Sequence, residues 1–230
     1  MLLLVVFKVP GVAAVADRSV PLTSAAVINR LSGPEASKGL PVRVEGVVVQ
    51  RWSGRQLLFM EADGRVLEVY APGTNHLVGI GQTIEVEGLS MDQAGPQVVA
   101  RSLTVLDAEY RRPNPQETAV SEIGESIAEP RWIQIDGVVR QAQWSSERLW
   151  LEVRDRGHLL QVNIPKAPKT DLHRLVFSRV RVSGVLTTWS RMSIERPGPV
   201  LWLGSADDLE IVSQHSDHLF DKIKVLPVRS

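Results

Sequence analysis

The chain has 230 residues, of which 43% are hydrophobic, so it can bury the core of one large domain or of two small ones. Lysine plus arginine equals aspartate plus glutamate at 26 each, and this balance argues against nucleic acid or an anionic membrane surface as the partner. Cysteine is absent, which excludes a disulfide framework, a thiolate nucleophile and cysteine-ligated metal sites.

The first sixteen residues have the pattern of a secretory signal peptide. Residues 2–7 are apolar, Pro10 and Gly11 break the run, and Ala14-Val15-Ala16 forms a small-x-small cleavage site. Lys8 interrupts the apolar run and no basic segment precedes it, so an apolar N-terminal strand is the alternative. We expect residues 1–16 to be a signal peptide and the protein to be periplasmic or otherwise extracytoplasmic. The run is too short for a transmembrane helix.

A leader and five strands follow. Residues 17–38 are expected to form a leader with a short helix at 23–31, which Ser32-Gly33-Pro34 stops. Apolar and polar residues then alternate with a period of two, as in half-buried strands, and turns rich in glycine and proline separate the runs. The predicted strands are 42–48, 57–61, 66–70, 83–88 and 97–106, and they define a first domain at 39–106.

The same order of elements returns after a proline-rich linker at 107–129, which has a short helix at 120–127. The second set of strands is 132–140, 148–154, 159–164, 179–184 and 200–212, the last interrupted by a turn at Asp207-Asp208, and it defines a second domain at 130–212. Gly46 and Gly137 are 91 positions apart, and so are Phe59 and Trp150. A register that holds within strands and shifts only between them indicates an internal duplication.

The tail at 213–230 has two interpretations. Pro227-Val228-Arg229-Ser230 is similar to Pro21-Leu22-Thr23-Ser24 at the entry to the first unit. The tail is therefore either the start of a further unit in a truncated chain or a frayed C-terminus.

The predicted fold class is mainly all-β, with two tandem five-stranded OB-like Greek-key barrels and short N-terminal leader helices. One continuous β-sandwich over both halves is the alternative, but closing each sheet removes the edges that five-stranded open sheets leave exposed. Acid-glycine pairs recur at Glu45-Gly46, Glu87-Gly88 and Asp136-Gly137, whereas serine precedes Gly184. These glycines are interpreted as bends where a strand changes partners, not as parts of a chemical motif.

OB barrels bind ligands on the face of their second and third strands, flanked by the loops between strands one and two and between strands four and five. Side chains that can stack on rings or grip anions occupy these positions, where Asn163 also lies. The candidate ligand-binding residues are Arg51, Trp52, Arg55, Trp144, Arg148, Trp150, Trp189 and Arg191.

The alternative for the aromatic residues is a structural role. Phe59 and Trp150 can point into the barrels, and a loop tryptophan often caps a barrel end. Charge favours the second unit as the site for an anion, because residues 39–106 carry five basic and seven acidic side chains and residues 130–212 carry twelve and nine.

No catalytic motif is present. The five histidines are scattered, HExxH, G-x-S-x-G and nucleotide-binding glycine patterns are missing, and the one close pair, His215 and His218, fits a solvated tail. We therefore predict no enzyme activity in this chain, no cofactor and no metal site.

Four segments together resemble the N-terminal extracytoplasmic region of certain bacterial sensor histidine kinases and related receptors: PLTSAAVINRLSGPEASKGLPVRVEGVVV, LLFMEADGRVLEV, VGIGQTIEVEG and PQVVARSLTVL. The resemblance covers Pro21 to Val212 and implies a non-catalytic sensory module of a two-component signalling protein. Its partner would be a small ligand or a periplasmic protein, with the membrane reached only through a missing downstream segment and a kinase domain encoded further on. The competing hypothesis is an OB protein that binds single-stranded oligonucleotides with its tryptophan and arginine face.

Overall fold

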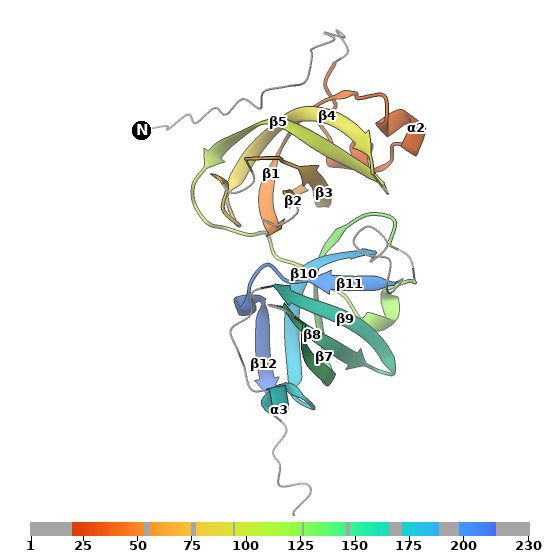
Figure 1. Ribbon diagram of the computed structural model, residues 1–230, viewed down its shortest axis with the longest axis vertical. Helices are drawn as coiled ribbons and strands as arrows, with labels where there is room; N and C mark the ends of the chain where they lie inside the picture. Colours follow the sequence, from red (N-terminus) through yellow and green to blue (C-terminus); the bar gives the residue numbers. More distant parts are fainter. Residues whose placement is uncertain are drawn as a thin grey trace, which may run out of the picture.

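A computed structural model of the protein describes residues 20–52, 56–74, 77–93, 95–125, 127–145, 148–165, 172–188 and 198–214. The signal peptide expected at 1–16 lies outside the described residues, as does the tail beyond residue 214. The described chain is mostly strand and forms two barrels, one above the other in Figure 1. The predicted fold class of two tandem OB-like barrels is therefore confirmed.

The first barrel is closed in the order β1-β2-β3-β5-β4. Its strands are β1 (Pro41–Trp52), β2 (Leu57–Ala62), β3 (Arg65–Tyr70), β4 (Thr83–Asp92) and β5 (Pro96–Asp107). All neighbouring pairs are antiparallel except β3 with β5. The short helices α1 (Ala25–Asn29) and α2 (Gly33–Ala36) precede it. Ala25 and Ile28 of α1 join the buried barrel core, which explains why this leader is helical and apolar on one side.

The second barrel repeats this plan with β7 (Arg131–Ser145), β8 (Arg148–Asp155), β9 (His158–Pro165), β10 (Arg179–Thr188) and β11 (Pro199–Trp202). Pairing of β10 with β7 and of β9 with β11 closes it around a core of its own. Two separate closed barrels rule out the single β-sandwich. A short helix that the sequence did not predict, α3 (Leu172–Leu175), lies between β9 and β10. The linker contributes β6 (Gln116–Glu117) and the single 3₁₀ turn η3 (Val120–Glu122).

The fifth strand of the second barrel is broken where the sequence predicts a turn. The 3₁₀ turn η5 (Ala206–Asp208) separates β11 from β12 (Leu209–Ser213), which pairs with β10. The buried carboxylate of Asp208 accepts hydrogen bonds from the amides of Gly204 and Ser205, both at 3.0 Å. These hydrogen bonds from local amides to the carboxylate stabilise a tight turn. The chain therefore leaves the barrel wall after β11 and pairs with β10 again at β12.

Glycine marks the point where the first strand of each barrel changes partners, as expected. β1 pairs with β4 up to Val47 and with β2 from Val47 onward, and β7 changes from β10 to β8 at Val138. A side chain at Gly46 or Gly137 would collide with the backbone of the new partner strand. The neighbouring acid of the second copy, Asp136, accepts a hydrogen bond from Arg181 at 3.0 Å, which raises the pKa of Arg181 above its ordinary value. The observed role of this acid is an ion pair across two neighbouring strands.

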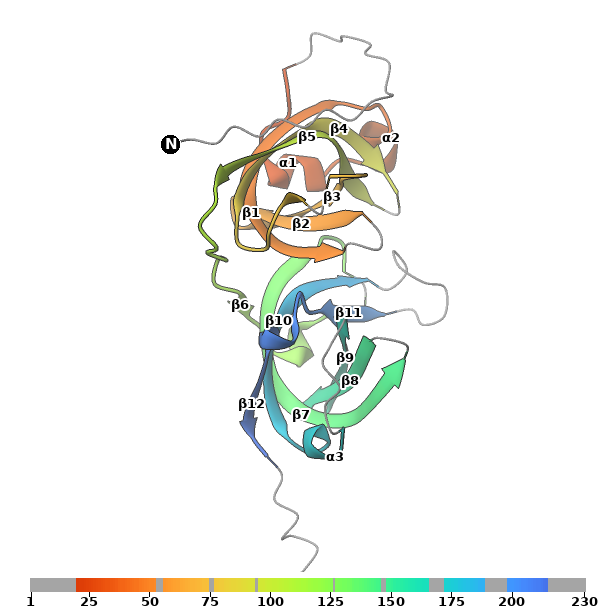
Figure 2. The ribbon, with the colours of Figure 1, turned by 60° about the vertical axis from the view of Figure 1, so that its left-hand side comes forward.

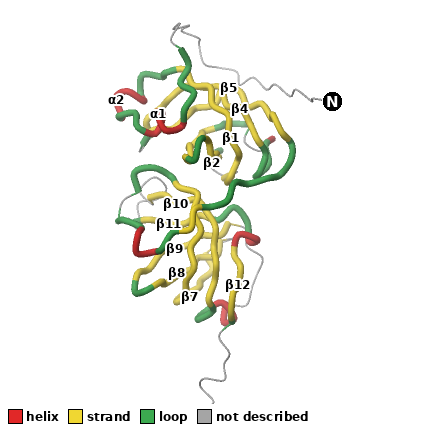
Figure 3. The backbone as a smooth tube through the Cα atoms, turned by 180° about the vertical axis from the view of Figure 1, so that it is seen from behind, coloured by secondary structure: helices red, strands yellow, loops and turns green. Residues whose placement is uncertain are grey.

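A third apolar cluster lies between the barrels, where β11 and the end of β10 approach β1, β2 and β3 (Figures 2 and 3). We call it the inter-barrel cluster. The partly buried Leu57 and Trp150 pack against it. Its buried members are Val49, Trp52, Phe59 and Val66 of the first barrel, and Trp132, Val185, Val200 and Trp202 of the second.

Candidate functional site

Trp202 is the centre of the inter-barrel cluster. Its ring centroid lies 4.5 Å from that of Trp52 and 5.8 Å from that of Trp150, in both cases edge to face. Trp52 in turn lies 5.4 Å from Phe59 with the rings nearly perpendicular. Edge-to-face pairs are favourable because the positive edge of one ring meets the negative face of the next. The four rings therefore connect the outer faces of both barrels.

A buried amide adds polar contacts to this interface. Gln50 of β1 is fully buried, and with its amide oriented to satisfy both atoms it donates to the carbonyl of Trp202 at 2.7 Å and accepts from Trp52 Nε1 at 2.9 Å. Hydrogen bonds are directional, whereas apolar burial is not. The bonds of Gln50 therefore fix how the two barrels are placed against each other.

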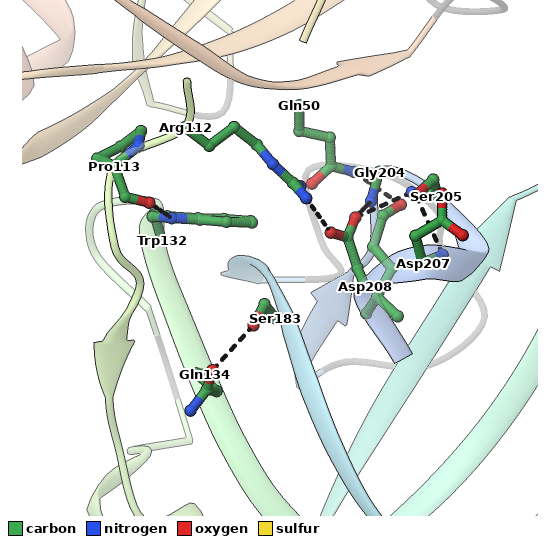
Figure 4. A network of polar contacts seen from close by, with 11 residues as sticks. Gln50, Arg112, Pro113, Trp132, Gln134, Ser183, Gly204, Ser205, Asp207 and Asp208 are labelled. Atoms are coloured by element: carbon green, nitrogen blue, oxygen red, sulfur yellow. Dashed lines mark hydrogen bonds and ion pairs between the residues drawn. The ribbon is translucent and has the colours of Figure 1, made fainter. Parts of the chain in front are cut away.

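The linker is held against the second barrel by Arg112 (Figure 4). Its guanidinium lies 2.5 Å from the carboxylate of Asp208, whose side chain is 1% exposed, and 5.3 Å from the ring centre of Trp132. Trp132 donates its indole N–H to the carbonyl of Pro113 at 2.9 Å. An ion pair, a cation–π contact and a hydrogen bond thus fix the chain between the barrels.

The outer β2–β3 face of the first barrel is closed by these contacts. Phe59 on β2 is 1% exposed and Val66 on β3 is buried, both within the inter-barrel cluster. Glu68, the next outward residue of β3, is also buried. The centre of the ligand face expected for an OB barrel is therefore covered by the second barrel.

The corresponding face of the second barrel is open over β7, β8 and β9. Leu149, Leu151 and Val153 of β8 point into the core, so the alternate residues of this strand face outward. Register places the outward residues of neighbouring strands in two rows. One row is Gln143, Trp150, Asn163 and Trp202, and the other is Gln141, Glu152, Gln161 and Val200.

Exposure changes along these rows. Gln141 and Gln143 on β7 are exposed, Trp150, Glu152 and Gln161 are partly buried, and Val200 and Trp202 on β11 are buried under the first barrel. Leu159 on the same face is 57% exposed. This surface, which we call the amide face, consists of Gln141, Gln143, Trp150, Glu152 and Gln161, with the buried Asn163 next to Trp150 in the register.

Two arginines flank the amide face. Arg148 lies at its loop end and Arg154 at the opposite end of β8, and both are exposed. Within the part of the chain that the structure describes, neither forms an ion pair. With Glu152 between them, the net charge of the surface is plus one. It offers two cations to an anionic ligand and several amides that both donate and accept.

The candidate residues predicted from the sequence lie in different environments. Arg51 donates to the carbonyl of Val78 at 2.7 Å, so it supports a loop of its own barrel, and Trp52 belongs to the inter-barrel cluster. Trp144 packs against the core of the second barrel. Arg148 and Trp150 meet at the amide face. Arg55, Trp189 and Arg191 lie outside the described residues, and with them most of the two loops that would flank a ligand.

The sequence analysis missed the three glutamines of the amide face. Gln141, Gln143 and Gln161 alternate with apolar residues that enter the core, so their outward direction was readable from the strand period. The strand period did not show that the three side chains share one surface. Their alignment depends on a bulge between Val139 and Gln141 that shifts the register of β7 against β8.

Other classes of site find no support in the described residues. No group of three or more histidine, aspartate or glutamate side chains among them is placed to hold a metal ion. No helix among them has the length and apolar character needed to cross a membrane.

Fold and surface together define a tandem OB-like protein with one closed and one open strand face. The chain matches no protein-family model and no curated protein sequence. Similar solved structures include fission yeast Pot1 with single-stranded DNA, at 10% identity and a TM-score of 0.40, covering 93% of this chain and 92% of that one.

Two further similar structures are a murine DNA-binding protein bound to double-stranded DNA and the Ifi202 HINa domain in complex with a 20-base-pair duplex. Both are 10% identical to this chain and cover 76% of it, at TM-scores of 0.37 and 0.35, and the chain covers 97% and 96% of them. Likeness at this level transfers no ligand and no role to this chain.

The expected resemblance to extracytoplasmic regions of sensor histidine kinases is wrong, and so is the sensory two-component role drawn from it. The three structures named above contain DNA and none is a receptor region, so they stand against the expectation that nucleic acid is not a partner, without assigning DNA to this chain. The physical reason is visible in the barrels. The segments that carried the resemblance are barrel walls, and glycines such as Gly46 and Gly88 are imposed by close strand approach. Such a pattern specifies an OB barrel and not a receptor.

Proposed function

We propose that this chain binds single-stranded nucleic acid on the amide face of its second barrel, without a chemical step. The observation that supports the proposal is the combination of a partly exposed Trp150, a set of side-chain amides and two exposed arginines, with no ion pair to any described residue, on one face of β7, β8 and β9. The first barrel does not bind the strand. It covers the β11 end of this face and holds Trp202 beneath it.

Each kind of side chain on this face has a counterpart in a single strand. An indole ring provides a platform on which a base can stack, and this contact tolerates any base. Glutamine and asparagine amides match base edges, which present donors next to acceptors. Arg148 and Arg154 lie at opposite ends of β8, so they can contact phosphates on either side of a stacked base. A duplex hides its base faces and is a poorer ligand for this surface.

Because the chain has no net charge, ionic contacts to phosphates should contribute only a small part of the binding affinity. With two arginines available, about two phosphates are contacted, and the slope of log affinity against log salt for a single strand is about −1.4. Strongly basic binders show much steeper slopes. Stacking and hydrogen bonding therefore supply most of the affinity, and binding should persist at moderate salt.

The test is fluorescence anisotropy with labelled 12-mers of single-stranded DNA and RNA and with a duplex of the same length, titrated at several salt concentrations. We expect saturable binding of single strands, quenching of tryptophan fluorescence, weaker binding of the duplex and the shallow salt slope. The absence of binding to every single strand at low salt would overturn the proposal. Binding of the duplex as tightly as of the single strands would contradict the stacking role of Trp150.

A further inference from the structure

Asn163 is the most unusual polar residue of the second barrel. Its side chain is fully buried, and neither its amide oxygen nor its amide nitrogen has a hydrogen-bond partner among the described residues. Buried amides are almost always satisfied, because an unpaired donor or acceptor costs free energy that a leucine of similar size would not. The position therefore calls for an explanation beyond packing.

The direction of Asn163 is fixed by its strand. Its neighbours Val162 and Ile164 enter the barrel core together with Leu160. Register places Asn163 opposite Trp150 on β8 and beside Trp202 on β11, both of which belong to the outer aromatic layer. The amide thus lies on the outer face between two indole rings and not inside the barrel.

Comparison with Gln50 shows that this interface can satisfy a buried amide. Gln50 is equally buried a short distance away and engages Trp202 and Trp52 through both of its polar atoms. Trp202 is covered by the first barrel, whereas Trp150 is partly exposed. Among the described residues, Trp150 is the less covered of the two rings, so access to Asn163 from this side requires a change of the Trp150 rotamer, of a kind common at binding surfaces.

We propose that Asn163 is the base-reading residue of the single-strand site and selects adenine when Trp150 turns aside. This inference rests on the proposed function and deepens it. An amide presents one donor and one acceptor side by side, which matches the ring nitrogen and the amino group of adenine in a bidentate pair. The pairing would satisfy both orphaned atoms of Asn163 at once, while Trp150 stacks on the same or the next base.

The test compares two single-stranded homopolymers of 12 nucleotides. Every base is adenine in one strand and unsubstituted purine, which is adenine without its amino group, in the other. The wild-type chain and the variants Asn163→Leu and Gln50→Leu are titrated with both. We expect the wild type to bind the adenine strand about tenfold more tightly, as one bidentate pair implies. N163L should bind both strands equally and unfold at higher urea concentration than the wild type, since it removes an unsatisfied amide.

The control Q50L removes an amide that is already satisfied, so it should be less stable than the wild type and keep the adenine preference. Equal binding of the two strands by the wild type, or an unchanged preference in N163L, would overturn the role of Asn163 while leaving single-strand binding intact. If the wild type binds neither strand nor any other single strand, the proposed function itself fails.

Discussion

Phe59 and Trp150 occupy the same position in two copies of one barrel but have different surroundings. Both are outward aromatic residues on the second strand, 91 positions apart. Phe59 is sealed against the second barrel, whereas Trp150 stays at the edge of the inter-barrel cluster and borders an open surface. The two copies of the barrel have two equivalent faces that could bind a ligand, and packing of the barrels against each other buries the centre of one of them.

The comparison shows why a tandem arrangement suits this chain. A face used for packing can be largely apolar. The packing face of the first barrel contains the apolar side chains of Leu57, Phe59 and Val66. A face used for binding needs polar groups that water can satisfy until a ligand arrives, and the amide face has them. The exposed glutamines therefore lie where the first barrel does not reach, whereas the polar residue buried in the interface, Gln50, has hydrogen-bond partners there.

The largest effect is expected from breaking the closed face at its centre. Trp202→Ala should destabilise the chain by about 3–5 kcal/mol, because it removes a buried ring that contacts both barrels. Urea unfolding followed by circular dichroism measures the change. The matched control is Leu159→Ala on the open side, a change in an exposed side chain that should stay within about 0.5 kcal/mol. Equal losses for both variants would contradict the division into a closed and an open face.

A smaller loss is expected at the linker. Asp208→Ala should cost about 3 kcal/mol, because it removes the ion pair with Arg112 and leaves the amides of Gly204 and Ser205 without an acceptor. Asp208→Asn keeps an acceptor for those amides, so it should cost less and isolate the ion pair. The exposed neighbour Asp207 serves as control, since Asp207→Ala leaves the Arg112 contact in place. A D208A variant as stable as wild type would show that the linker contact does not hold the barrels.

The smallest effect concerns the charge of the open face. Arg148→Gln should reduce the salt slope of single-strand binding from about −1.4 to about −0.7, because one phosphate contact is lost. Arg111→Gln removes the same charge from an exposed site on the linker and should leave the slope unchanged. Anisotropy titrations over a range of salt concentrations measure both. An equal fall in slope for the two variants would indicate a diffuse charge effect in place of a contact.

Sequence reasoning predicts the barrels well because their cause is local. Alternation with a period of two fixes which side of each strand is buried, and Gly46 and Gly137 mark the change of partner strand. Asp207-Asp208 likewise signals the turn that interrupts the last strand. Each of these signals lies within a few residues of the feature that it predicts.

The sequence could not show which outward-facing side chains of one barrel are covered by the other barrel. Trp52 and Trp202 are far apart in the chain, and nothing in their local patterns indicates that their rings meet. For Phe59 the sequence therefore left a ligand face and the barrel core as the two interpretations, and the interface that it occupies was not predicted. The resemblance to a receptor family had the same limit, because barrel-wall patterns carry no information about loops or outer faces.

The most direct test compares Phe59→Ala with Trp150→Ala in the single-strand binding assay, at a temperature where circular dichroism shows both variants folded. We predict that F59A, although less stable, binds like the wild type. W150A should bind about 5-fold to 100-fold more weakly, the loss of one stacked base. A loss of affinity in F59A equal to that in W150A, or wild-type affinity in W150A, would contradict the assignment of binding to the open face of the second barrel.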